Sequence, residues 1–164
     1  KMTLGVNSFI PATPYGILQL FQRYKIDLDG KKCLVIGRSQ IVGRPISILL
    51  SQSNEFCNAT VTLAHSRTIN LDLLTLDSDV IISAIGKPEF LKAEMVKEGA
   101  IIVDVGISRV KDASSQKGYR IVGDVDFKNV SKKASYITPV PGGVGPMTIA
   151  MLLSNTLEAC KKND

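Results

Sequence analysis

The 164-residue sequence predicts a single α/β domain with a doubly wound, mostly parallel β-sheet. Short apolar runs of the kind that form buried strands alternate along the chain with segments whose apolar residues recur at helical spacing. Loops that contain glycine or proline separate these segments. The content of 45% hydrophobic and 21% charged residues is ordinary for a globular protein, and the length is sufficient for one core.

The N-terminal part of the chain predicts one helix. We expect it to begin at Thr13, whose hydroxyl can cap it, with Pro14 in the first turn, where a missing N–H is harmless. Apolar residues then recur at helical spacing as far as Tyr24, and Asp29-Gly30 predicts a turn. Residues 1–12 contain no clear element, and we interpret them as a connection from something upstream.

The next segments alternate between strand and helix. Residues 33–36 are a short apolar run typical of a strand that is buried on both faces of a parallel sheet. A helix is expected at 42–50, because its apolar residues have helical spacing and Pro45 falls in the first turn. A strand at 59–63 and a short helix at 71–76 repeat the pattern.

The same alternation continues in the second half of the chain. We expect strands at 80–84 and 101–105, because both are apolar runs followed closely by glycine, with a helical segment at 92–97 between them. The polar stretch 110–120 predicts a loop or an exposed hairpin. Strands that alternate with helices in this way form a parallel sheet with crossover helices.

The bulk properties narrow the class of protein. A net charge of +5 favours anionic partners, and a phosphate-bearing small molecule satisfies it as well as nucleic acid does. Because the few aromatic residues do not interleave with a basic stripe, we expect no nucleic acid partner. No apolar run approaches the roughly 20 residues of a membrane span, so we expect no membrane partner. Three scattered cysteines and a single histidine fit a reducing, cytoplasmic compartment and argue against a structural metal site.

The loop at 37–43 joins the first predicted strand to the next helix. In this setting the pyrophosphate of a dinucleotide binds backbone N–H groups and the helix dipole. The usual G-x-G-x-x-G pattern is broken, because Ser39 replaces the second glycine and Gly43 comes one residue late. The position after the first buried strand still indicates a Rossmann-type nucleotide site. The candidate cofactor contacts in this loop are Gly37, Arg38, Ser39, Ile41, Val42 and Gly43.

The second predicted strand ends in His65, Ser66, Arg67 and Thr68, which are further candidate cofactor contacts. NAD-binding folds usually place a carboxylate near this point, where it would repel the 2′-phosphate of NADP. Here a hydroxyl and a guanidinium can bind that phosphate, with Arg38 as a second candidate, so we expect NADP rather than NAD. Two alternatives stay open: Arg67 as a solvated surface residue, and His65 as a strand-end residue satisfied by backbone, which we prefer to a catalytic role.

A loop dense in proline and glycine joins the last predicted strand, at 136–138, to the last predicted helix, at 146–160. Such a bare backbone allows a flat ligand to lie against the main chain, with N–H groups of the helix start facing it. The alternative is a tight connection that binds nothing. The candidate ligand contacts are Pro141, Gly142, Gly143, Val144, Gly145, Pro146, Met147, Thr148 and Ile149.

Two carboxylates stand beside glycines at the ends of expected strands. Asp104 comes two residues before Gly106, and Asp124 follows Gly123 directly. A ligand role fits both positions. A structural role, in which each carboxylate holds a turn, fits them at least as well.

Taken together, six segments resemble the methylenetetrahydrofolate dehydrogenase/methenyltetrahydrofolate cyclohydrolase family, in its C-terminal NADP-binding domain. They occur in the order found in that family and span nearly the whole chain. The segments are 11–17, 37–43, 65–68, 103–107, 123–127 and 138–148.

The resemblance implies an enzyme that oxidises 5,10-methylenetetrahydrofolate with NADP and hydrolyses 5,10-methenyltetrahydrofolate to 10-formyltetrahydrofolate. It implies cofactor contacts at Gly37, Arg38, Ser39, Ser66 and the backbone around Gly106 and Ile107. It places residues 141–149 along the folate and the nicotinamide. It also implies a homodimer, since family members often pair through this domain.

The catalytic residues of the family are missing from this sequence. They include a Tyr-x-x-x-Lys pair in an N-terminal folate-binding domain, and none of the four tyrosines here has lysine four positions later. The resemblance therefore implies that 1–12 is a connection from that domain and that 13–164 is the NADP-binding domain, inactive alone. The alternative is a stand-alone NADP-binding regulatory module. Another dehydrogenase, such as a shikimate-type reductase, is disfavoured by the proline- and glycine-rich loop.

Overall fold

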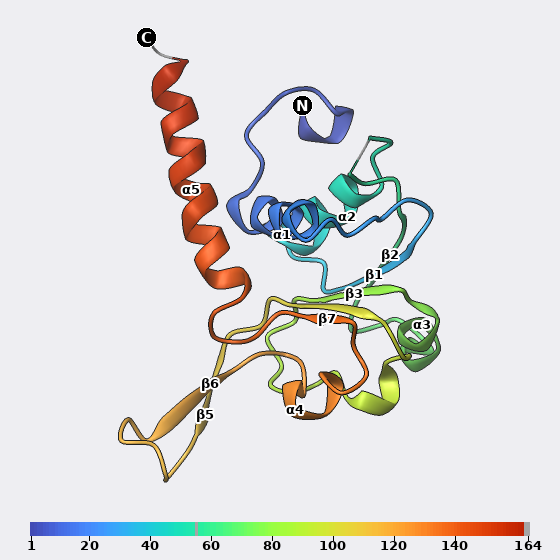
Figure 1. The fold of residues 1–164 in the computed structure, drawn as a ribbon, viewed down its shortest axis with the longest axis vertical. Coiled ribbons are helices and arrows are strands. Elements are labelled where there is room, and N and C mark those ends of the chain that lie inside the picture. Colours follow the sequence, from blue (N-terminus) through green and yellow to red (C-terminus); the bar gives the residue numbers. More distant parts are fainter. Residues whose placement is uncertain (55, 163–164) are drawn as a thin grey trace.

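The computed structural model describes residues 1–54 and 56–162. Its centre is a five-stranded sheet with the order β2-β1-β3-β4-β7, in which every pair of neighbours is parallel (Figure 1). The predicted α/β class with a parallel sheet is confirmed. The strands are β1 (Lys32–Ile36), β2 (Thr60–Ala64), β3 (Val80–Ser83), β4 (Ile101–Asp104) and β7 (Tyr136–Ile137).

Helices cover both faces of the sheet, which is the doubly wound arrangement (Figure 1). Helices α1 and α2 pack on one face, and α3, α4 and a short 3₁₀ turn, η2, pack on the other. No helix within the described residues is both long enough and apolar enough to cross a membrane. The helices are α1 (Ala12–Arg23), α2 (Gly43–Leu50), α3 (Leu71–Asp77), α4 (Phe127–Val130) and α5 (Val144–Lys161), with 3₁₀ turns η1 (Met2–Leu4) and η2 (Ala93–Met95).

The sheet separates two apolar cores, and β1 shows how the sequence builds both. Cys33 and Val35 are buried against α1 and α2, whereas Leu34 and Ile36 are buried on the opposite side. Successive side chains of a strand point to opposite faces, so a continuous apolar run is needed where both faces are covered. This is why β1 could be predicted from four residues.

The start of α1 differs from the prediction. The helix begins at Ala12 with Pro11 before it, and the Thr13 hydroxyl makes no capping bond. It lies instead 2.9 Å from the Thr148 hydroxyl of α5. Thr13 is held at this crossing because the helices approach closely: a Cβ built on Gly16 would lie 2.9 Å from Cβ of Met147. The cap prediction was therefore wrong, because a tertiary contact occupies the hydroxyl.

Other expected elements change in extent. The helix expected at 92–97 is reduced to the single turn η2, because Leu91 is already extended and bridges to Val125. The polar stretch near 110–120 forms the hairpin alternative, with β5 (Ser108–Lys111) antiparallel to β6 (Tyr119–Val122). Elements as short as α4 and η1 contain too few residues to show a helical period, so they could not be predicted.

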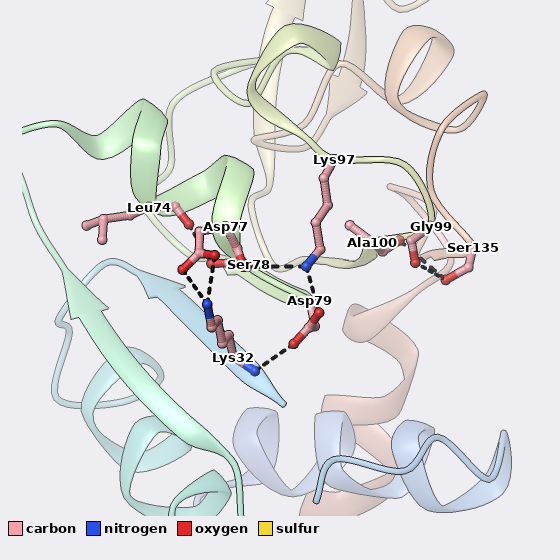
Figure 2. Close-up of polar contacts among 9 residues, drawn as sticks. All are labelled: Lys32, Leu74, Asp77, Ser78, Asp79, Lys97, Gly99, Ala100 and Ser135. Carbon is pink, nitrogen blue, oxygen red and sulfur yellow. Dashed lines mark hydrogen bonds and ion pairs between the residues drawn. The ribbon is translucent and has the colours of Figure 1, made fainter. Parts of the chain in front are cut away.

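Charged side chains form ion pairs and hydrogen bonds at the amino ends of β1 and β3 and before β4 (Figure 2). Lys97 Nζ lies 2.6 Å from Asp79 Oδ1, and the Lys32 N–H donates to Asp79 Oδ2 at 2.8 Å. Lys32 Nζ also pairs with Asp77 at 2.8 Å. The side-chain hydrogen bond from Lys97, followed by the backbone bond from Lys32, lowers the pKa of Asp79. Asp79 thus ties the starts of β1 and β3 to the segment before β4.

We expect Asp79→Asn to destabilise the chain by about 1 kcal/mol at neutral pH, because Lys97 loses its charged partner in a half-buried position. The folded pKa of Asp79 is lowered, so its contribution is present above the unfolded pKa and is lost as pH falls through the folded value. Urea denaturation at neutral pH and at about pH 3 measures this. Asp77→Asn, at a more exposed pair, should have a smaller effect. Equal losses for Asp79→Asn at both pH values would contradict the assignment.

Candidate functional site

The carboxyl ends of β1, β3 and β4 lie at one edge of the sheet, where open parallel sheets bind their ligands. Two pockets open at this edge. A pocket of about 300 Å³ lies beside the end of β1, and a larger pocket of about 500 Å³ lies between the end of β4 and the start of α5. Most of the residues predicted as contacts fall in or beside these two pockets.

The loop between β1 and α2 folds back tightly on itself. Gly37 has φ of 111°, and a Cβ at this position would collide with the Ala84 carbonyl of β3's end. A Cβ on Gly43 would collide with the carbonyl oxygen of Gly37. Both glycines are therefore required by the backbone itself. Gly43, which comes one residue later than in the usual pattern, is the point at which α2 packs onto the loop.

Ser39, which stands where a second glycine is usual, organises this loop. Its hydroxyl accepts hydrogen bonds from the N–H groups of Val42, at 3.1 Å, and Gly43, at 3.3 Å. Val42 and Gly43 are buried, so they shape the loop rather than offer free donors. Within the described residues, the N–H groups from Arg38 to Ile41 have no hydrogen-bond acceptor. Such consecutive free N–H groups before a helix are suited to bind an anion.

The smaller pocket brings together predicted residues from different segments. Gly37 and Arg38 line it from the β1 loop, and Ser66 lines it from the end of β2. Lys87 also lines it, from the loop after β3, and its Nζ lies 5.8 Å from the centre of the Phe90 ring. Lys87 was not predicted as a site residue, although its place just beyond a buried strand was a usable signal. Two cations and a hydroxyl at one pocket suit a phosphate.

The turn from His65 to Thr68 is closed by its own hydrogen bonds. The His65 N–H donates to the Thr68 hydroxyl at 2.8 Å, and the Thr68 N–H donates to the His65 carbonyl at 2.9 Å. His65 Nδ1 accepts the N–H of Arg67 at 3.1 Å, so His65 is satisfied by backbone. Of these four residues only Ser66 lines the pocket, whereas Arg67 is exposed to solvent.

The larger pocket collects Gly106 and Ile107 and nearly all of the predicted ligand contacts in residues 141–149. The exception is Met147, which faces α1 at Gly16 and lines a different pocket. Helical geometry explains this, because consecutive residues at the start of α5 point in different directions. Thr13 completes the wall from α1.

Two buried carboxylates lie at this pocket: Asp104 lines it, and Asp124 is buried behind Asp104. Asp104 Oδ1 accepts the N–H groups of Gly106 and Asp124, at 2.9 and 2.8 Å, and Oδ2 accepts that of Val125 at 2.9 Å. Asp124 Oδ2 accepts the Ile85 N–H at 2.8 Å and longer hydrogen bonds from the Gly86 N–H and the Ser83 hydroxyl. Burial raises the pKa of Asp104 to about 6. Of the two roles considered from the sequence, these hydrogen bonds agree with the structural one, in which each carboxylate holds a turn.

Comparison with known proteins agrees with this geometry. Residues 11–164 match the family described as tetrahydrofolate dehydrogenase/cyclohydrolase, NAD(P)-binding domain. Bifunctional protein FolD of Flavobacterium johnsoniae is 64% identical over 161 residues, which are 98% of this chain and 55% of the relative. The chain thus spans about half the length of the curated relatives it matches.

Solved structures give the same result. The bifunctional FolD enzyme of Campylobacter jejuni matches 99% of this chain and 55% of its own, with a TM-score of 0.90 and 51% identity. The Trypanosoma brucei dehydrogenase-cyclohydrolase, complexed with NADP and an inhibitor, matches 97% of this chain and 53% of its own, with a TM-score of 0.88 and 41% identity.

Cofactor choice varies among the relatives. The trypanosomal structure contains NADP, whereas the Saccharomyces cerevisiae relative, 28% identical with a TM-score of 0.70 over 95% of this chain and 53% of its own, is NAD-dependent. The fold, the glycine loop and the matched region agree on one assignment. This chain belongs to the tetrahydrofolate dehydrogenase/cyclohydrolase family, as its NAD(P)-binding domain.

Proposed function

We propose that the chain is the NADP-binding part of an enzyme that oxidises 5,10-methylenetetrahydrofolate and hydrolyses 5,10-methenyltetrahydrofolate to 10-formyltetrahydrofolate. The observation that carries this proposal is the pairing of two pockets at one sheet edge. One presents free backbone N–H groups and cations, and the other is a largely apolar pocket whose wall is mostly glycine and proline backbone. A dinucleotide has a charged half and a flat half, which these two pockets match.

The residues present fit the phosphates of NADP. The free N–H groups from Arg38 to Ile41 would bind the pyrophosphate, and Arg38 and Ser66 would bind the 2′-phosphate, with Lys87 adding positive charge. No carboxylate lines this pocket within the described residues, which supports NADP over NAD. When bound, NADP supplies the hydride acceptor. The chain's own part is to hold and orient it.

The larger pocket would receive the nicotinamide and one edge of the folate. Pro141, Gly142 and Gly143 present main chain and the carbons of the proline ring to the ligand. A flat ring of the ligand packs well on such a surface. Ile107 and Ile149 are more than half exposed beside it, so a bound folate would cover them. These groups exclude water and orient the reactants, and they carry out no proton transfer.

The acid and base groups would come from a separate folate-binding segment. The relatives are long enough to contain such a segment in addition to the part that this chain matches. The apolar side chains of α5 support this, since Leu152, Leu153 and Leu157 are each more than half exposed. We propose that this segment packs on that face of α5 and that the assembled enzyme forms a homodimer. The three free cysteines support the cytoplasm as its location.

We expect this chain to bind NADP but to catalyse neither reaction by itself. Calorimetric titration with NADP, together with assays of both activities, tests this directly. Absence of heat from binding at millimolar NADP would refute the cofactor site. Appreciable turnover would refute the division of roles between the two segments.

A further inference from the structure

The wall of the larger pocket contains an uncompensated negative charge. In the described part of the chain, Asp104 is the only charged residue that lines the pocket. Asp124 is buried directly behind it, with no exposed surface. The ion pairs formed within the described residues include neither carboxylate.

The hydrogen bonds to these carboxylates come from neutral groups. Five are backbone N–H groups, and the sixth is the Ser83 hydroxyl, 3.3 Å from Asp124 Oδ2. The remaining oxygen, Asp124 Oδ1, is buried and has no hydrogen-bond partner in the described residues. It lies against Gly106, where an added Cβ would collide with it, and Gly106 itself lines the pocket. The unpartnered oxygen and the pocket are thus separated by one residue of backbone.

We propose that Asp104 and Asp124 make the larger pocket bind the oxidised, cationic form of nicotinamide in preference to the reduced, neutral form. The oxidised ring carries one more positive charge than the reduced ring, and the two forms otherwise offer the pocket nearly the same surface. Two carboxylates without a cation attract that charge, because both are buried and solvent screens them little. This inference rests on the proposed function, since it requires the nicotinamide to lie in this pocket.

Asp124→Asn tests the charge with little change to the structure. The amide oxygen can keep the bonds that Oδ2 accepts from Ile85 and Gly86, and the NH₂ group can take the place of Oδ1, which has no partner. Asp104→Asn is less suitable, because both of its oxygens accept backbone N–H groups and one bond would be lost. Glu98→Gln removes the same charge at the exposed opposite end of β4 and is the control.

The measurement is the dissociation constant of NADP⁺ and of NADPH for each variant, by calorimetric titration of this chain. Asp124→Asn should lower the preference for NADP⁺ over NADPH about tenfold, while NADPH affinity stays within about twofold. Glu98→Gln should leave the preference unchanged. Equal weakening of both forms would show a purely structural role and overturn the inference. Failure of the unmodified chain to bind either form would overturn the proposed function and this inference together.

The unmodified chain provides a second test that does not depend on a variant folding. The groups that contact Asp104 come from its own loop (Gly106), from the position just after β7 (the Thr138 hydroxyl) and from the loop after β6 (Asp124 and Val125), and Asp124 is the titratable one among them. Between about pH 8 and pH 5.5 Asp104 gains a proton, so the preference for NADP⁺ should fall about threefold. Titration of the 2′-phosphate cancels in this ratio. A constant preference over that range would contradict the inference.

Discussion

Replacing Arg38 with alanine is expected to weaken NADP binding about a hundredfold while NAD binding changes by less than about threefold. Arg38 lines the smaller pocket together with Ser66, and only NADP carries the 2′-phosphate that these two side chains would bind. Calorimetric titration of the variant with each cofactor gives both numbers. Ser66→Ala should show the same selectivity with a smaller loss of about tenfold.

Two other arginines serve as controls for this assignment. Arg44 lies on α2, outside the pocket lining, and Arg67 is exposed in the turn after β2. Alanine at either position should reduce NADP affinity by at most about threefold, through the loss of general positive charge. If Arg67→Ala caused the larger selective loss, the phosphate would be bound on the turn side and Arg38 would be wrongly placed. Equal losses for NADP and NAD in Arg38→Ala would exclude a 2′-phosphate contact altogether.

Gly43→Ala is expected to abolish measurable NADP binding and to destabilise the chain by about 1–3 kcal/mol. The new Cβ would collide with the carbonyl oxygen of Gly37, which is backbone and cannot rotate away. Helix α2 would have to move off the loop, and the bonds that Ser39 makes to Val42 and Gly43 would be lost with it. Urea denaturation and NADP titration of the same sample measure both effects.

Gly145→Ala is the matched control for the stability change. This glycine is in the first turn of α5, and within the described residues no atom outside its chain neighbours and the adjacent helix backbone lies within 4 Å of the position that its Cβ would occupy. Alanine is favoured over glycine in a helix, so this variant should be as stable as the unmodified chain or slightly more stable. Normal NADP binding by Gly43→Ala would mean that the close packing of helix and loop is not needed for the cofactor site.

Local patterns in the sequence were enough to predict the sheet and the glycine loop. Strand β1 could be predicted because burial on both faces leaves a continuous apolar run, and the Gly37 loop could be predicted because it follows that run. The hairpin alternative for residues 110–120 was visible in their polarity. Its pairing, Arg109 with Ile121 for example, needs the fold to be known.

What could not be predicted depends on contacts between distant residues. Thr13 resembles a helix cap until Thr148, far along the chain, is placed beside it. Arg67 follows the same strand end as Ser66, but the turn that closes between His65 and Thr68 leaves it in solvent. Lys87 follows a buried strand, but only the fold shows that it lines the same pocket as Arg38 and Ser66. The hydrogen bonds to the carboxylates of Asp104 and Asp124 join three separate segments, so their chemistry appears only in the folded chain.

We propose that backbone N–H groups between β1 and α2 bind the phosphates of a dinucleotide whose flat ring lies by the proline- and glycine-rich loop. A crystal structure of this chain with NADP tests it most directly. We expect the pyrophosphate within hydrogen-bond distance of the N–H groups from Arg38 to Ile41 and the nicotinamide against Gly106 and Gly143. Cofactor bound at another edge of the sheet, with the Gly37 loop untouched, would contradict the claim.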